Sequence, residues 1–139
     1  MVYSSLLLEI FIKIDCVISI FLYNNSKRDF MFKENVIENK RKKDLEKKQR
    51  KDALLVRNKF LAEWASNILE LDAHKKIKYI NKFSKFTKEN NKFIIKKIEE
   101  DFAKYDILIS YKEILLKTKD FHIKANILVE NKFKLNNWK

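Results

Sequence analysis

Residue types that carry catalytic chemistry are sparse in this 139-residue chain. It has no glycine, which excludes glycine-rich phosphate loops and the GxSxG turn of serine hydrolases. Cys16 is the only cysteine, so the chain can form neither an internal disulfide nor a cysteine-rich zinc site. His74 and His122 lack the spacing of a zinc motif, and we interpret both as helix-surface or boundary residues. The sequence therefore predicts no catalytic residue, no metal and no required cofactor.

Paired carboxylates do not change this prediction. Glu99 and Glu100 are adjacent, and adjacent positions on a helix point in different directions. We interpret them as solvated helix charges rather than as a general acid and base. The protein is expected not to be an enzyme and to act by binding a partner.

The formal net charge of +12 indicates the kinds of partner that the chain could bind. A basic chain favours nucleic acid, an anionic membrane or an acidic protein surface. Lys, Asn and Ile dominate the composition, as they do in proteins from AT-rich genomes, so the charge also has a purely compositional explanation. Charge alone does not select among these partners.

The absence of both glycine and proline determines the expected fold class. Sheets and α/β folds usually need glycine where φ is positive and proline where a turn is pre-set, whereas helices joined by Asn, Asp and Ser turns need neither. The chain is therefore predicted to be all-α. We expect a four-helix bundle with a long first helix and a charged, mobile N-terminal extension.

Four apolar stripes with helical spacing define the expected helices. The expected buried positions are Leu54, Leu61, Trp64, Ile68 and Leu71; then Ile77, Ile80, Phe83 and Phe86; then Ile94, Ile95, Ile98 and Phe102; and finally Ile114, Thr118, Phe121, Ala125 and Leu128. Asp72 is predicted to cap the second helix, and Asn90 and Asn91 the third. Ser110 and Glu113 form the S-x-x-E capping box that opens the fourth.

Residues 1–30 differ in composition from the rest of the chain. They are mostly apolar, but Glu9, Lys13 and Asp15 oppose a membrane span, because each charge near its centre costs about 2.5–3.5 kcal/mol. No basic start or small-residue cleavage site indicates a signal peptide. We favour an over-extended start, with Met31 as the first residue. A membrane-associating leader and a core element are the alternatives.

Three further segments follow. Residues 31–52 form a charged segment in which the run from Glu38 to Asp52 has Leu45 as its only aliphatic residue. Without an apolar stripe no core can hold this run, so it is expected to be solvated and free to bind something else. Residues 53–130 form the bundle. Residues 131–139 form a polar tail in which Trp138 has no assigned role.

The run from Arg57 to Ala65, RNKFLAEWA, resembles the RNKLLGLWA signature of the zeta subunit of alphaproteobacterial F-type ATP synthases. Tyr79 falls at the family's helix-two tyrosine, IEEDF at 98–102 is similar to its VRADF, and ILIS at 107–110 is similar to its turn ending in serine. The resemblance covers about Met31 to Val129. Its specific part is the signature, with the residues Arg57, Asn58, Lys59, Leu61 and Trp64.

This resemblance implies an ATPase inhibitor, a regulatory subunit whose N-terminal segment enters a catalytic interface between the alpha and beta subunits, beside the gamma rotor. It implies a cytoplasmic, peripheral location at the head of the synthase, with only indirect membrane contact. Some members bind adenine nucleotides through the bundle. The partner-binding residues expected in the inhibitory segment are Phe32, Val36, Ile37, Lys43, Leu45 and Lys48.

One departure leaves the strength of inhibition open. Lysines occupy Asn39 to Lys51, where family inhibitors carry spaced phenylalanines, and an inhibitory helix needs apolar anchors. The main alternative function is a basic helical nucleic-acid-binding protein, since eight Lys or Arg lie between Lys40 and Lys51. Against it, acidic residues interrupt that stretch and no helix-turn-helix glycine is present. A membrane-surface protein that uses residues 1–30 is the third hypothesis.

Overall fold

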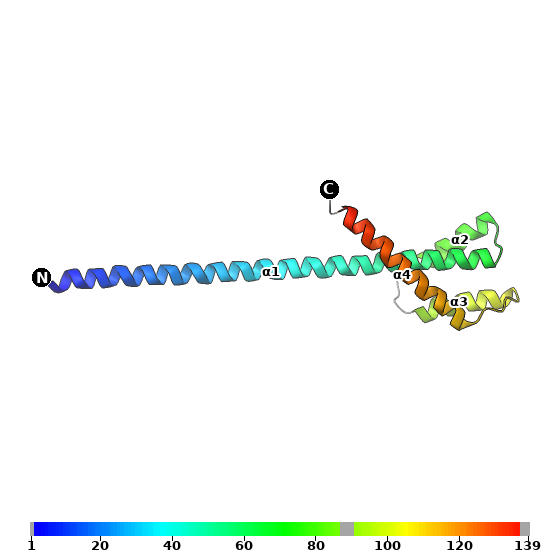
Figure 1. Cartoon of the computed structure of the whole chain (residues 1–139), viewed down its shortest axis with the longest axis horizontal. Helices are drawn as coiled ribbons and strands as arrows, with labels where there is room; N and C mark the ends of the chain where they lie inside the picture. Colours follow the sequence, from blue (N-terminus) through cyan, green and yellow to red (C-terminus); the bar gives the residue numbers. More distant parts are fainter. Residues whose placement is uncertain (1, 87–90, 137–139) are drawn as a thin grey trace. The chain divides into compact units, whose positions relative to one another are not determined.

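The computed structural model describes the backbone of residues 2–86 and 91–136, with side chains from residue 5 onward. Its elements are α1 (Val2–Ile68), α2 (Ala73–Ser84), α3 (Asn91–Lys104) and α4 (Tyr111–Asn136) (Figure 1). The described residues contain no strand. The predictions of an all-α chain and of a long first helix are therefore confirmed.

The chain divides into two compact units, Met1–Asp44 and Leu45–Lys139. The first unit consists of the N-terminal part of α1. The second contains the rest of α1 together with α2, α3 and α4, which surround one hydrophobic core. The charged segment 31–52 lies within α1. Its mobility, and the segment boundaries expected from composition, remain predictions.

Two helices end in left-handed residues although the chain has no glycine. Glu70 has φ 50° and Asp106 has φ 56°. Each sits in a Schellman motif: the Leu71 amide donates to the Ser66 carbonyl at 3.2 Å, and the Ile107 amide donates to the Phe102 carbonyl at 3.0 Å. Glycine would adopt this conformation without the steric conflict of a Cβ, so both turns are strained by their own side chains.

The predicted caps of α2 and α4 are present. Asp72 accepts a hydrogen bond from the Lys75 amide at 2.9 Å. The capping box is reciprocal: the Glu113 carboxylate accepts from the Ser110 amide at 2.8 Å, and the Ser110 hydroxyl accepts from the Glu113 amide at 3.3 Å. Asn91 is the first residue of α3, and Asn90 lies outside the described residues.

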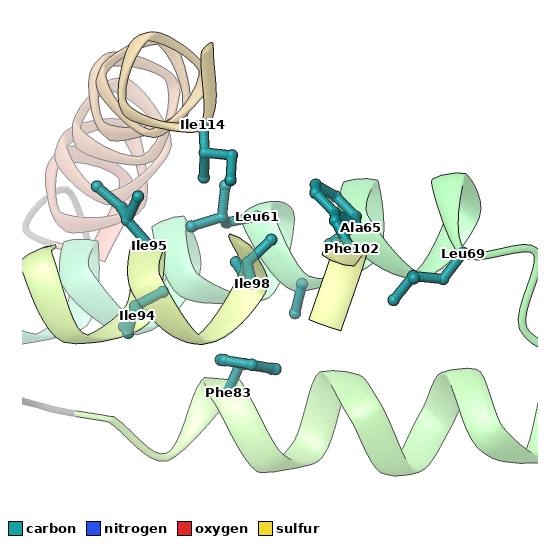
Figure 2. Packing of buried hydrophobic residues seen from close by; sticks show 10 residues of the cluster. Leu61, Ala65, Leu69, Phe83, Ile94, Ile95, Ile98, Phe102 and Ile114 are labelled. Atoms are coloured by element: carbon teal, nitrogen blue, oxygen red, sulfur yellow. The ribbon is translucent and has the colours of Figure 1, made fainter. Parts of the chain in front are cut away.

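Side chains from all four helices form the core of the second unit. Figure 2 shows Phe83 pointing from α2 toward the side chains of α3, and Ile114 pointing from α4 toward Leu61. All four residues predicted for the α3 stripe are buried. The buried cluster is Leu61, Ala62, Ala65, Leu69, Phe83, Ile94, Ile95, Ile98, Phe102 and Ile114.

Two predicted core residues are not buried. Ile77 is 60% exposed, because a spacing of three residues drifts around a helix and leaves it about 120° away from the buried Phe83. Leu128 is 51% exposed, and Val129, four residues after the buried Ala125, takes its place in the core. Trp64, Ile68, Leu71, Ile80, Phe86 and Phe121 are partly buried against the core as expected.

The described part of the C-terminal tail, residues 131–136, is helical throughout, because α4 continues through Asn136. Phe133 is partly buried and Leu135 is exposed. Trp138 lies outside the described residues. Within the described ranges, no helix is long and apolar enough to cross a membrane.

Candidate functional site

The apolar residues expected in the inhibitory segment all lie on the surface of α1. Phe32 is 70% exposed, and Val36, Ile37 and Leu45 are also exposed. Large apolar side chains in water favour association with a partner that covers them. The segment therefore has free apolar groups despite its high charge.

The helix does not bring all of these residues to one face. Within the first unit, Phe32, Val36 and Lys43 follow one another at spacings of four and seven residues, which places them on one face of α1. Ile37 is adjacent to Val36 and therefore points about 100° away. The face that carries Phe32, Val36 and Lys43 is thus the best candidate contact surface in that unit.

The other two expected contact residues belong to the second unit. Leu45 and Lys48 are three residues apart on α1 and both are exposed. The Lys48 ammonium lies 5.9 Å from the ring centroid of Phe133 on α4. This cation–π contact gives Lys48 a partner within the bundle.

The first two residues of the family signature are buried in a polar network. Arg57 is 1% exposed and Asn58 is fully buried. The Asn58 side-chain oxygen accepts two hydrogen bonds from Arg57, at 3.1 Å from Nε and at 2.7 Å from Nη2. The Asn58 amide nitrogen donates to the Phe86 carbonyl at 2.6 Å, and Arg57 Nη1 donates to the Asn91 side chain. The pair therefore ties α1 to Phe86, two residues after α2, and to the start of α3.

Sequence reasoning identified Arg57 and Asn58 as signature residues but missed this network. The signal was present, because both positions fall between Leu54 and Leu61 on the face that the apolar stripe assigns to the core. Buried polar groups need partners, so two polar residues inside such a stripe predict a network. The partner Asn91 is 34 residues away from Arg57 in the sequence and could not be inferred from spacing.

The remaining signature residues have different roles. Leu61 is fully buried in the core, and Trp64 packs edge-on against Phe102 with ring centroids 5.7 Å apart. Lys59 is exposed on the opposite side of α1. The signature therefore combines core packing, a buried polar network and one solvated cation.

A pocket of about 520 Å³ adjoins this network. Arg57 and Asn91 contribute to its wall together with Arg50, Leu54, His122 and Asn126. Burial lowers the pKa of the Arg57 guanidinium, yet among the described residues no carboxylate forms an ion pair with it. Two arginines, a histidine and two amides make this a candidate site for an anionic ligand.

Tyr79 and Asp101 form a second polar contact between helices, at the position of the family's helix-two tyrosine. The Tyr79 hydroxyl donates to the Asp101 carboxylate at 3.2 Å, and Lys104 pairs with the same carboxylate at 3.2 Å. Burial and, next, the neighbouring Asp101 charge raise the pKa of Tyr79 well above its usual range. The phenol is therefore a neutral hydrogen-bond donor that links α2 to α3.

No candidate metal centre accompanies these sites. In the part of the chain that the structure describes, no three His, Cys, Asp or Glu side chains are grouped closely enough to hold a metal ion. Cys16 is exposed on α1 in the first unit.

Comparison with known families decides the affiliation of the chain. The sequence profile of the family described as ATPase inhibitor subunit zeta matches residues 27–127. The chain belongs to this family. The match contains the segment 31–52, the signature at 57–65, all of α2 and α3, and α4 as far as residue 127.

Membership in the zeta family confirms the resemblance drawn from the signature. It places the chain in a family of ATPase inhibitors, whose role is regulatory rather than catalytic, and implies association with an ATP synthase. No curated protein and no solved structure shows a significant match to the chain.

Proposed function

We propose that this zeta-family protein inhibits ATP hydrolysis by an F-type ATP synthase by inserting its N-terminal segment, residues 31–52, at a catalytic interface between the alpha and beta subunits. The gamma subunit is the third expected partner, beside the inserted helix. The observation that carries the proposal is the family match across residues 27–127, which includes this whole segment.

The structure of the segment supports a helix that acts through one face. Phe32 and Val36 supply exposed apolar side chains, and Lys43 supplies a cation on the same face. Buried apolar anchors contribute most of the affinity at an interface, whereas rim charges mainly affect association rate and specificity. With only two anchors on this face, we propose that inhibition is weaker than that of a segment with regularly spaced phenylalanines.

The test is ATP hydrolysis by the purified cognate synthase, titrated with the full chain and with residues 53–139. We expect the full chain to inhibit and the shorter chain to have no effect, because the latter lacks the segment. Inhibition by residues 53–139 alone would contradict the assignment to residues 31–52. Absence of inhibition by both, together with failure to co-purify with the synthase, would refute the proposed function.

Two double variants of the full chain locate the contact face. Phe32→Ser with Val36→Ser removes both anchors, and we expect at least about a tenfold loss of inhibitory affinity. Lys33→Ser with Ile37→Ser is the control, with the same spacing on another face of α1, where it removes one cation and one apolar side chain. Equal losses in the two variants would contradict a one-sided contact.

The pocket beside Arg57 favours a second, separate activity, the binding of an adenine nucleotide. Its wall offers the exposed Arg50 guanidinium to phosphate oxygens, and the buried Arg57 adds a second positive charge beside it. Calorimetric titration with ADP should show binding that Arg50→Gln or His122→Gln weakens. The control Lys59→Gln removes an exposed cation that is not part of the pocket wall and should leave the affinity unchanged. Identical affinities in all variants would rule out this pocket.

A further inference from the structure

Residues 6–22 of α1 carry a wide apolar face. At about 100° per residue, nine large apolar side chains fall within about 160° of the helix circumference, with no polar residue among them. Their exposed fractions lie between 47 and 66%. The nine, hereafter the apolar face, are Leu6, Leu7, Ile10, Phe11, Ile14, Val17, Ile18, Phe21 and Leu22.

The other half of the helix circumference over residues 6–22 carries both polar and apolar side chains. It carries the charged residues Glu9, Lys13 and Asp15, and the polar Ser19, between apolar neighbours. These charges oppose a helix that crosses a bilayer, in keeping with the absence of a membrane span among the described residues. They do not oppose a helix that lies in the plane of the interface, where its charged side stays in water.

The acidic residues of the first unit, unlike its cations, are concentrated on one half of the helix. The cations lie on both halves, with Arg28, Lys40, Lys42 and Lys43 on the apolar side and Lys13, Lys27, Lys33 and Arg41 on the other. Residues that are 18 or 36 positions apart on a helix point in the same direction, because these spacings are about five and ten whole turns. Arg28 therefore points in the same direction as Ile10, and Lys42 in the same direction as Leu6. Lys43 follows Leu7 in the same way. Of the six acidic residues in this unit, only Asp29 lies on this side; the other five, on the opposite half, are Glu9, Asp15, Glu34, Glu38 and Asp44.

We propose that the first unit binds flat on an anionic lipid surface, with the apolar face of residues 6–22 inserted between headgroups and acyl chains, and with Arg28, Lys42 and Lys43 toward the lipid phosphates. Residues 1–30 then act as the membrane-associating leader, in place of the over-extended start that the composition favoured. The apolar face is about 25 Å long, which suits a helix parallel to the surface. The cations on the same side complement anionic headgroups, and the acids on the other side stay in water.

A second copy of the chain fits this face less well. A coiled-coil seam would use the heptad positions Leu7, Ile10, Ile14, Val17 and Phe21. The next seam positions are Asn24 and Arg28, so the apolar seam covers about two heptads, fewer than the three or four that a coiled coil needs. A dimer would also leave Phe11 and Leu22, outside the narrow seam, in water. A lipid surface covers the full width of the face.

The experiment is co-sedimentation of the full chain with vesicles of phosphatidylcholine containing about 30 mol % phosphatidylglycerol, and with vesicles of phosphatidylcholine alone. The test variant is Ile10→Glu with Ile14→Lys, which keeps the net charge. The matched control is Leu8→Glu with Ile12→Lys, which places the same pair at the same spacing on the other half of the helix. All four replaced side chains are exposed, so neither variant disturbs the core.

We expect the wild-type chain to bind the anionic vesicles, the test variant to lose at least about tenfold in partition coefficient, and the control to stay within about threefold. Lys42→Gln with Lys43→Gln should weaken binding to anionic vesicles only, and more than Lys33→Gln with Arg41→Gln on the other half. Equal losses in the test and control variants would overturn the proposal, as would a wild-type chain that binds neither vesicle.

Sedimentation velocity without lipid tests whether a second copy of the chain, rather than lipid, covers the apolar face. A stable dimer that the test variant dissociates, in a chain that binds no vesicles, would assign the face to a second copy and overturn the proposal. The apolar face lies before residue 27, where the family match begins, so this part of the proposal does not depend on ATPase inhibition. Arg28, Lys42 and Lys43 lie within the match, and Lys43 is shared with the proposed inhibitory face. The Ile10→Glu with Ile14→Lys variant should therefore lose lipid binding and keep ATPase inhibition.

Discussion

Replacement of Asn58 by leucine should be one of the most destabilising single substitutions in this protein. Asn58 is fully buried, and its side chain takes part in three hydrogen bonds, two with Arg57 and one with the Phe86 carbonyl. Leucine has a similar volume, so the change leaves little cavity. It does leave guanidinium donors and a carbonyl without their partner.

The expected loss follows from those groups. A buried polar group without a partner costs about 1–3 kcal/mol, and more if it is charged. Two features limit this cost: Arg57 keeps its hydrogen bond to Asn91, and the adjoining pocket admits water. We therefore expect Asn58→Leu to lower the free energy of unfolding by about 3 kcal/mol in total. This is a large fraction of the 5–15 kcal/mol that is typical of a folded domain. The exposed neighbour Lys59→Ala should change the free energy of unfolding by less than about 0.5 kcal/mol.

Urea unfolding of the full chain measures this difference. Trp64 packs against Phe102 in the core, and its fluorescence in a Trp138→Phe background reports on that packing. The double variant Arg57→Leu with Asn58→Leu provides the coupling energy, because it also removes the guanidinium that Asn58→Leu leaves with Asn91 as its remaining hydrogen-bond partner. We expect its loss to be at least about 1 kcal/mol smaller than the sum of the two single losses. A loss below about 1 kcal/mol for Asn58→Leu, or full additivity, would refute the buried network.

Three further predictions concern local features of the bundle. The raised pKa of Tyr79 means that its neutral form is favoured in the folded state; its contribution to stability is therefore complete below about pH 10 and is lost as pH rises beyond that value. A difference titration of the wild type against Tyr79→Phe at alkaline pH should show no phenolate absorbance from Tyr79 until the bundle unfolds, and a step near pH 10 would contradict the buried contact with Asp101. Ser110→Ala should cost about 1 kcal/mol through loss of the N-cap of α4, measured by urea unfolding, with Ser110→Asn as the variant that restores it. Glu70→Gly should raise the free energy of unfolding by up to about 1 kcal/mol, because Glu70 has a φ of 50°, which glycine adopts without strain. The control Ala65→Gly, inside α1, should lower the free energy of unfolding. A loss of stability in both variants would show that the turn at Glu70 is not strained.

Local features of the fold were predictable from the sequence. The caps of α2 and α4 depend on Asp72, Ser110 and Glu113, whose bonds join residues only three positions apart. The stripe of α3 was also recovered in full, because this short helix is covered along one face. Such features are set within one or two helical turns, and the sequence contains that information directly.

The candidate site was predictable only in part. The signature marked Arg57 and Asn58, and the family match supports the affiliation that it indicated. Spacing could not show that these residues are buried together with Asn91, or that Lys48 lies against the Phe133 ring. Both contacts join helices that are distant in the sequence.

The sequence by itself determined that this chain is helical throughout its described elements, because without glycine and proline it has few other regular structures to adopt. The tertiary structure decided which residues of each helix are covered. It placed Val129 rather than Leu128 in the core and left Ile77 in solvent, since the rotation of each helix depends on its neighbours. It also brought two polar signature residues inside, where the Phe86 carbonyl, two residues after α2, and Asn91, at the start of α3, satisfy their hydrogen bonds.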